Sequence, residues 1–189
     1  MNIIQIGCNN GDDHVYEFIS GFDGAVKACL VDVSEKAIES ARERYSGLSG
    51  VEVFCSAICP EGVGELEIFY SNDLADQGLS FRSNHLLDHG IVGEINSFVV
   101  RCQSVNDFIA KCGMDVIDRL YIDVEGLDCL LVSEIDFLRF DIRMLMFEHV
   151  HSESTRDWGD STLYKRVIER LVSFGFSISV TGVDTVCVK

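Results

Sequence analysis

Short apolar runs alternate with helix-forming stretches along the chain, and this alternation most limits the folds that it can adopt. Strands separated by helices form a mostly parallel sheet with helices on both faces. The runs predicted as the parallel strands are Asn2–Ile6, Lys27–Val31, Val51–Cys55, Arg119–Ile122 and Arg143–Phe147. We therefore predict an α/β fold built in three layers.

The end of the chain predicts an antiparallel addition to this sheet. A helical stripe stops at Gly175, a residue type that favours the C-terminal end of a helix. Phe176–Val180 and Thr185–Val188 follow as two strands joined by a tight turn near Gly182. The other expected elements are helices at 13–20, after the N-cap Ser34, at Val105–Cys112 and at Asp128–Ile135, and strands at Glu65–Tyr70 and Ser97–Cys102.

The length of 189 residues, without an internal repeat or a linker, predicts a single domain over residues 1–189. Ser71–Asn96 is the least regular part and is polar throughout. A connection of that length in a compact domain is typical of a lid or a binding loop.

The net charge of −16 argues against two classes of partner, nucleic acids and anionic membrane surfaces, because both would be repelled. The first residues lack the basic and apolar regions of a signal peptide, so we expect a cytoplasmic protein. Several of the eight cysteines lie in apolar runs, and Cys55 and Cys59 lack the spacing of a zinc or redox motif. We expect reduced cysteines that pack in the core.

Polar residues follow the predicted parallel strands at their carboxyl ends, where open parallel sheets bind their ligands. These polar segments are Gln5–Gly11, Asp32, Ser56–Ala57, Asp123–Gly126 and Glu148–His151. Their placement predicts one site that is shared by several strand ends.

Gly7 and Gly11 permit a tight turn after the first strand, and Asp32 is spaced to hold the two hydroxyl groups of a ribose. A nicotinamide dinucleotide site uses similar features, but its middle glycine is replaced here by Asn9. Asp12 and Asp13 would also repel a pyrophosphate at the start of the next helix. The pattern favours a nucleoside ligand with a positive centre and no phosphate, such as S-adenosylmethionine.

These residues resemble those of the FkbM-type methyltransferases, which are S-adenosylmethionine-dependent enzymes, over nearly the whole chain. The most specific match is Ile117–Gly126, which ends in the Asp-Val-Glu-Gly signature. The turn Ile6–Gly11, the strand end Leu30–Asp32 and the segments Phe147–His149 and Asp184–Thr185 match in order. The resemblance implies a Rossmann-like class I methyltransferase fold, a three-layer sandwich whose seven-stranded, mostly parallel sheet ends in an antiparallel hairpin.

The resemblance also implies roles for individual residues. Gly7, Asn9 and Gly11 would hold the methionine part of the donor, and Asp32 would hold its ribose. The residues beside the adenine would be Val33, Ser56 and Ala57. Gln5 stands where the family commonly has an acidic residue near the ammonium group of the donor. The acceptor implied by the family is a small molecule with a hydroxyl group, such as a carbohydrate.

Methyl transfer to a hydroxyl requires a base within hydrogen-bonding distance of the attacking oxygen. The candidates at adjacent strand ends are Asp123, Glu125, Glu148, His149 and His151. We expect Asp123 to orient donor or acceptor, and Glu148 or His149 to act as the base. Glu125 has a structural alternative, in which it binds the first amides of the following helix.

Several alternatives stay open at this stage. The strand-end carboxylates and histidines are also suitable metal ligands, although no spacing demands a metal. His85 and His89 are expected in the lid, and Trp158 either packs in the core or lines an acceptor pocket. A catalytically silent binding domain and a nicotinamide-linked oxidoreductase remain the competing functions. Because no helix precedes the first strand to cover the site, we expect a second copy or a partner domain to do so.

Overall fold

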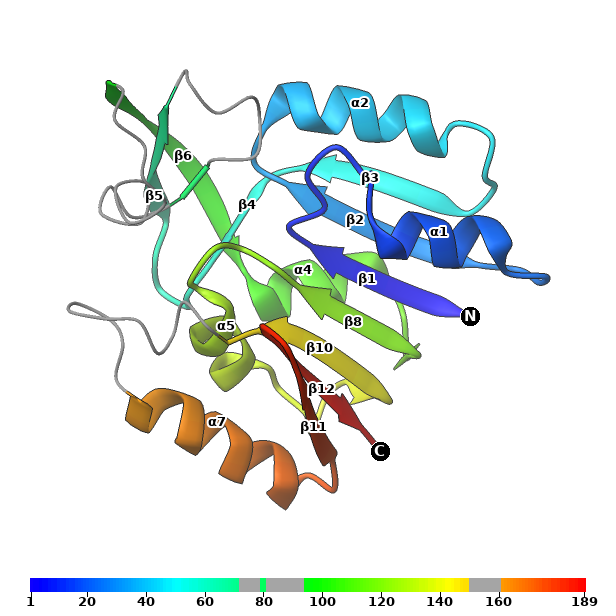
Figure 1. The fold of residues 1–189 in the computed structure, drawn as a ribbon, viewed down its shortest axis with the longest axis vertical. Helices are drawn as coiled ribbons and strands as arrows, with labels where there is room; N and C mark the ends of the chain where they lie inside the picture. The colour runs from blue at the N-terminus through cyan, green and yellow to red at the C-terminus, as the bar shows by residue number, and fades with distance from the viewer. Residues whose placement is uncertain (72–78, 81–93, 150–160) are drawn as a thin grey trace.

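The computed structural model describes residues 1–71, 79–80, 94–149 and 161–189. The strands of its largest sheet are β1 (Asn2–Ile6), β2 (Lys27–Asp32), β3 (Val51–Cys55), β8 (Arg119–Ile122), β10 (Met144–Glu148), β11 (Ser177–Thr181) and β12 (Asp184–Val188). They lie side by side in the order β11-β12-β10-β8-β1-β2-β3 (Figure 1). The five strands from β3 to β10 in this order are parallel to one another, whereas β12 is antiparallel to both β10 and β11. The predicted α/β sheet with its closing hairpin is thus confirmed.

Two smaller sheets accompany the large one. In the first, β6 (Ile95–Ser104) lies between β4 (Ala57–Cys59) and β5 (Glu65–Ser71), and it extends away from the large sheet in Figure 1. The second pairs β7 (Val116–Ile117) with β9 (Asp141–Ile142). The short strands β4, β7 and β9 have too few residues to show a periodic pattern, and the sequence analysis did not predict them.

Helices cover both faces of the large sheet, as predicted. They are α1 (His14–Gly21), α2 (Glu35–Tyr45), α4 (Val105–Cys112), α5 (Asp128–Glu134) and α7 (Ser161–Ser173). Ser34 caps α2 as expected, since its hydroxyl accepts the amide of Ala37 at 3.2 Å. Within the described ranges, no helix has the length and apolarity needed to span a membrane.

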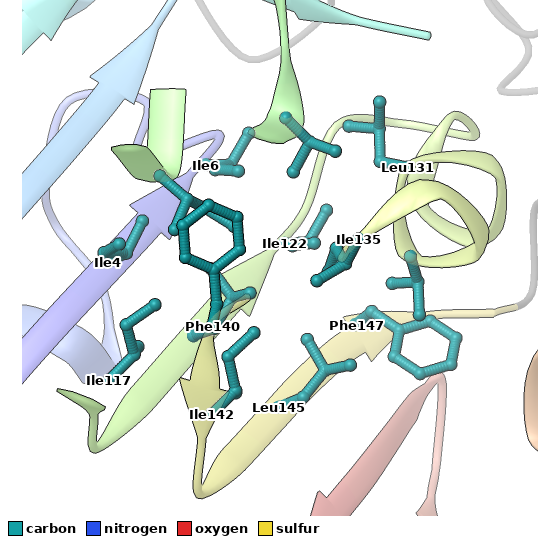
Figure 2. Packing of buried hydrophobic residues seen from close by; sticks show 14 of the residues in the cluster. Ile4, Ile6, Ile117, Ile122, Leu131, Ile135, Phe140, Ile142, Leu145 and Phe147 are labelled. Atoms are coloured by element: carbon teal, nitrogen blue, oxygen red, sulfur yellow. The ribbon is translucent and has the colours of Figure 1, made fainter. Parts of the chain in front are cut away.

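Alternate residues along each central strand supply the cores of the two faces. Ile3 and Leu30 belong to a buried cluster with side chains of α1 and α2. Ile4 and Ile6 face the opposite way, into a larger cluster with residues of α4 and α5 (Figure 2). The sheet therefore forms the middle layer, and its strand ends are held rigidly from both sides.

Cys59 on β4 and Cys102 on β6 form a disulfide. This corrects the expectation that all the cysteines are reduced, which holds for the six others. The two cysteines are 43 positions apart, and only the pairing of β4 with β6 brings them together. Because that pairing is not local, no spacing motif in the sequence predicts the disulfide.

We expect the paired substitution of Cys59 and Cys102 by serine to lower the free energy of unfolding by about 2 to 4 kcal/mol, because a cross-link over a long loop restricts the unfolded chain. Denaturant unfolding without reductant measures the loss. Cys55→Ser is the matched control, since Cys55 is exposed and free. Equal stability of the wild type with and without reductant would contradict a structural role for this disulfide.

Candidate functional site

A tight turn connects β1 to α1 and lies against the end of β2. The amides of Gly7 and Cys8 both donate to the carbonyl oxygen of Val31, at 2.9 and 3.1 Å. Gly7 and Asn9 have φ values of +84° and +44°, in the left-handed region that favours glycine and tolerates asparagine. The turn is therefore locked to the neighbouring strand, and it closes around the carboxyl end of β1.

Asp32 joins this turn to the start of α2. Its Oδ2 accepts the amide of Asn9 at 2.9 Å, and its Oδ1 accepts the amide of Ser34 at 3.0 Å. Burial raises the pKa of Asp32, while these backbone hydrogen bonds oppose the rise by favouring the charged form. Each carboxylate oxygen can accept further hydrogen bonds, so Asp32 can still bind a ligand.

A cavity of about 130 Å³ lies beyond the carboxyl ends of β1 and β2, next to the point where the strand order reverses between β1 and β8. Six of the residues predicted to bind a cofactor line it: Gly7, Asn9, Asp32, Val33, Ser56 and Ala57. Asp123 and Glu125 line it as well. The apolar wall made by Ile58, Leu66 and Ile68 was not predicted from the sequence.

A second cavity, of about 320 Å³, adjoins the first, because Gly7, Asn9 and Asp123 line both. It opens on the α1 face of the sheet. Its other polar lining residues include Gln5, Asp12, Asp13, His14, Tyr121, Glu148 and Asp184. The two cavities share the walls at Gly7, Asn9 and Asp123 and together lie across the ends of four neighbouring strands, β2, β1, β8 and β10.

Gly11 lies outside both cavities, although it was predicted to bind the donor. A Cβ atom at Gly11 would lie 2.8 Å from Cε2 of Tyr45, a buried residue of α2. Gly11 therefore permits close packing between the turn and α2.

Two polar atoms beside these cavities have no hydrogen-bond partner among the described residues. Gln5 is 4% exposed; its Nε2 donates to Oδ2 of Asp13 at 2.7 Å, but its Oε1 is unpaired. The Oδ1 atom of Asn9 is unpaired too. A buried acceptor without a partner is costly, so both atoms favour a ligand that donates hydrogen bonds.

The Asp-Val-Glu-Gly loop is held by Asp128, which the sequence analysis placed in a helix without a function. Asp128 is 1% exposed and accepts the amides of Val124 and Gly126 at 3.1 and 2.9 Å. Glu125 between them has a φ of +54°, which is rare for this residue type. Asp128 thereby fixes the strained backbone that directs Glu125 toward the first cavity. The sequence signal for this role was an aspartate two positions after a turn glycine, because aspartate side chains commonly accept hydrogen bonds from nearby backbone amides in turns.

Carboxyl groups around the site have raised pKa values. Burial, followed by the charge of Asp123, raises the pKa of Glu125 to about 7. Burial and then four neighbouring carboxyl groups, with Asp123 first among them, raise the pKa of Glu148 to about 8. The pKa of Asp123 is raised by burial and by Asp184. Such shifts suit groups that exchange protons near neutral pH.

Glu148 and His149 point to opposite faces of the sheet, because successive side chains of a strand alternate. Glu148 lines the second cavity together with Met146. His149 is 8% exposed, its Nδ1 lies 3.1 Å from the Thr185 hydroxyl, and its ring stacks on Tyr164 of α7. Of the two neighbouring candidates for the base, only Glu148 lines either cavity.

The remaining candidates His85, His89, His151 and Trp158 lie outside the described residues, as does most of Ser71–Asn96. Leu79 and Ser80 of that connection are described, and both line the first cavity. Within the described part of the chain, no group of three or more His, Cys, Asp or Glu residues is arranged to hold a metal ion.

The fold is similar to that of solved methyltransferases. The O-methyltransferase from Bacillus cereus, in complex with SAH, matches all of this chain over 74% of its own length, with a TM-score of 0.57 and 15% identity. Cofactor-bound Rv0187 from MTB matches 99% of this chain over 72% of its own, with a TM-score of 0.51 and 11% identity. No family model and no curated protein match the sequence. The similarity confirms the predicted Rossmann-like class I methyltransferase fold.

Proposed function

We propose that the chain is an S-adenosylmethionine-dependent methyltransferase that methylates a hydroxyl oxygen of a small polar acceptor such as a sugar. The observation that carries this proposal is the pair of adjoining cavities, in which Asp32 and the Gly7 turn lie beside strand-end carboxylates. The FkbM-type resemblance supports the choice of oxygen and of a small acceptor. The charge of −16 supports a small molecule over a nucleic acid as the partner.

The residues of the two cavities fit the donor. Asp32 would accept hydrogen bonds from the ribose, while Ser56 and the apolar wall at Ile58 and Leu66 would surround the adenine. The unpaired Gln5 Oε1 would accept a hydrogen bond from the ammonium group of the methionine part. These roles use atoms that the protein itself leaves without partners or with spare acceptor capacity.

The bound donor would supply a methyl group activated by a sulfonium. Asp123 lines both cavities and would orient the groups that meet there. Glu148 lines the second cavity, where the methionine part of the donor and the acceptor would meet, and its carboxylate would take the proton of the attacking hydroxyl. The walls of the two cavities would hold the reacting groups in line, which is the main contribution of a protein to this displacement.

An NAD-linked oxidoreductase is disfavoured by the start of α1. Oδ1 of Asp13 accepts the amides of Val15 and Tyr16 at 2.8 and 3.0 Å. A dinucleotide pyrophosphate binds to such amides at the start of a helix. In this chain the amides are already bonded, and the carboxylate of Asp13 would repel the phosphate.

The test of this proposal is calorimetric titration with S-adenosylmethionine, S-adenosylhomocysteine and NAD. We expect both adenosyl compounds to bind and NAD not to bind. Asp32→Ala should raise the dissociation constant of both by roughly 10- to 100-fold, because hydrogen bonds to a charged group contribute about 1.5 to 3 kcal/mol.

Glu39→Ala, an exposed change on α2, should leave the affinity unchanged. Saturable binding of NAD alone would replace the proposal with an oxidoreductase. Donor binding without methyl transfer to any hydroxyl compound would instead support a catalytically silent domain.

A further inference from the structure

Three carboxyl groups lie in a row across the neighbouring strands β8, β10 and β12. Glu148 ends β10 and is directly opposite Asp184 in the antiparallel pair with β12. On its other side, Phe147 of β10 pairs with Ile122 of β8, so that Glu148 lies beside Asp123, the residue after Ile122. All three carboxyl residues line the second cavity.

Like charges directly opposite each other destabilise a sheet. The groups that raise the pKa of Glu148 to about 8 are, after its burial, Asp123, Glu125, Asp128 and Asp184. For Asp123, burial comes first; Asp184, Asp13 and Asp32 also raise the pKa, and His14 lowers it. Burial and the charges of neighbouring carboxyl groups therefore make it costly for Glu148 and Asp123 to be ionised together.

A second observation indicates that this cavity receives a positively charged or hydrogen-donating ligand. Gln5 Oε1 is an acceptor without a partner, it belongs to a side chain that is 4% exposed, and that side chain lines the same cavity. Among the described residues, none that lines the cavity is a lysine or an arginine. The acidic row and this buried acceptor together favour a ligand that carries a positive charge or donates hydrogen bonds.

We propose that Asp123 and Glu148, which lie beside Asp184, share a proton while the donor is absent and release it to solvent when the sulfonium-bearing donor binds. This inference rests on the proposed function and adds a regulation of the same site. Below a pH of about 8, donor binding would thus convert Glu148 to the carboxylate at the moment when a methyl group is present to be transferred. A positive charge near the row lowers the free energy of its fully ionised form, which is the physical basis of the release.

The protons and charges of the cycle balance. On donor binding, the row loses one proton to the solvent and gains one negative charge beside the positive sulfonium. Glu148 then takes the proton of the acceptor hydroxyl while a carbon–oxygen bond forms and the carbon–sulfur bond breaks. The product pair is a neutral thioether and a protonated carboxyl group, so the row returns to its initial charge.

The test is calorimetric titration of the whole chain at pH 7 in phosphate and in Tris, two buffers that differ in their enthalpy of ionisation. The dependence of the binding enthalpy on the buffer gives the number of protons released. We expect S-adenosylmethionine to release up to about one proton more than S-adenosylhomocysteine, which lacks the sulfonium charge. Glu148→Gln should abolish this difference, and Asp184→Asn should reduce it.

The control Glu39→Gln changes an exposed carboxyl group of α2 and should release protons as the wild type does. Equal proton release by the two ligands in the wild type would overturn the inference and leave the donor site intact. A difference that persists in both Glu148→Gln and Asp184→Asn would show that another group titrates. Failure of both ligands to bind the wild type would overturn the proposed function itself.

Discussion

Glu148→Gln is expected to lower kcat by about 10²- to 10⁴-fold, which is the usual contribution of a general base. The amide keeps the size of the side chain but cannot accept the hydroxyl proton. Transfer of a labelled methyl group to an acceptor found by screening small hydroxyl compounds measures the loss. Donor affinity should change far less, because the contacts assigned to the ribose and the adenine lie in the first cavity, which Glu148 does not line.

The neighbouring change His149→Gln provides the contrast for this experiment. His149 faces Thr185 and Tyr164, away from both cavities, so its loss should lower stability more than kcat. For the wild type, kcat/KM for the donor should rise with pH through about 8, because the carboxylate form of Glu148 is the active one. A kcat unaffected by Glu148→Gln would exclude this residue as the base.

Gly7→Ala is expected to cost on the order of 3 to 5 kcal/mol of stability, near the upper end of single-substitution effects. A Cβ atom at Gly7 would lie 1.6 Å from the carbonyl oxygen of Asp123. Because the clash is with backbone, relief requires β1 and the Asp-Val-Glu-Gly loop to separate. Denaturant unfolding measures the loss, and donor binding should disappear with it.

Gly62→Ala separates this clash from the strain of the backbone conformation. Gly62 has a φ of +81°, almost the same as the +84° of Gly7, but nothing lies within 4 Å of its Cβ position. It should cost only about 1 to 2 kcal/mol, the penalty for an L side chain in the left-handed region. Equal losses for the two variants would show that the contact with Asp123 is unimportant.

The main sheet could be predicted because its signals are local. Each central strand is a continuous apolar run, and the observed bounds of β1, β3 and β8 equal the predicted ones. Ser34 and Gly175 lie at helix ends as their residue types favour. The position of Asp32 at the end of β2 followed from the same reasoning.

The orientation of candidate residues could be predicted less well. Glu148 and His149 are adjacent, and a shift of one position in the strand would exchange their faces. The sequence prediction therefore kept both residues as candidates for the base. Gly11 fits the pattern of a ligand-binding turn, but its contact is with Tyr45, 34 positions later.

Non-local pairing explains what the sequence did not reveal. The apolar wall at Leu66 and Ile68 depends on the pairing of β5 with β6, in which Leu66 lies opposite Val100, 34 positions later, and Ile68 lies opposite Phe98, 30 positions later. The disulfide between Cys59 and Cys102 depends likewise on β4 pairing with β6. Such contacts are set by the tertiary fold, and a single sequence carries no periodic trace of them.

The walls of the first cavity belong to two different sheets. Asp32 and Gly7 are attached to the large sheet, whereas Leu66 and Ile68 project from the small one. The width of this cavity therefore depends on the position of the small sheet relative to the large one. The disulfide joins two strands within the small sheet and does not link that sheet to the large one. Substitutions on β6 that lie away from the cavity can therefore change the affinity for a nucleoside without contacting it.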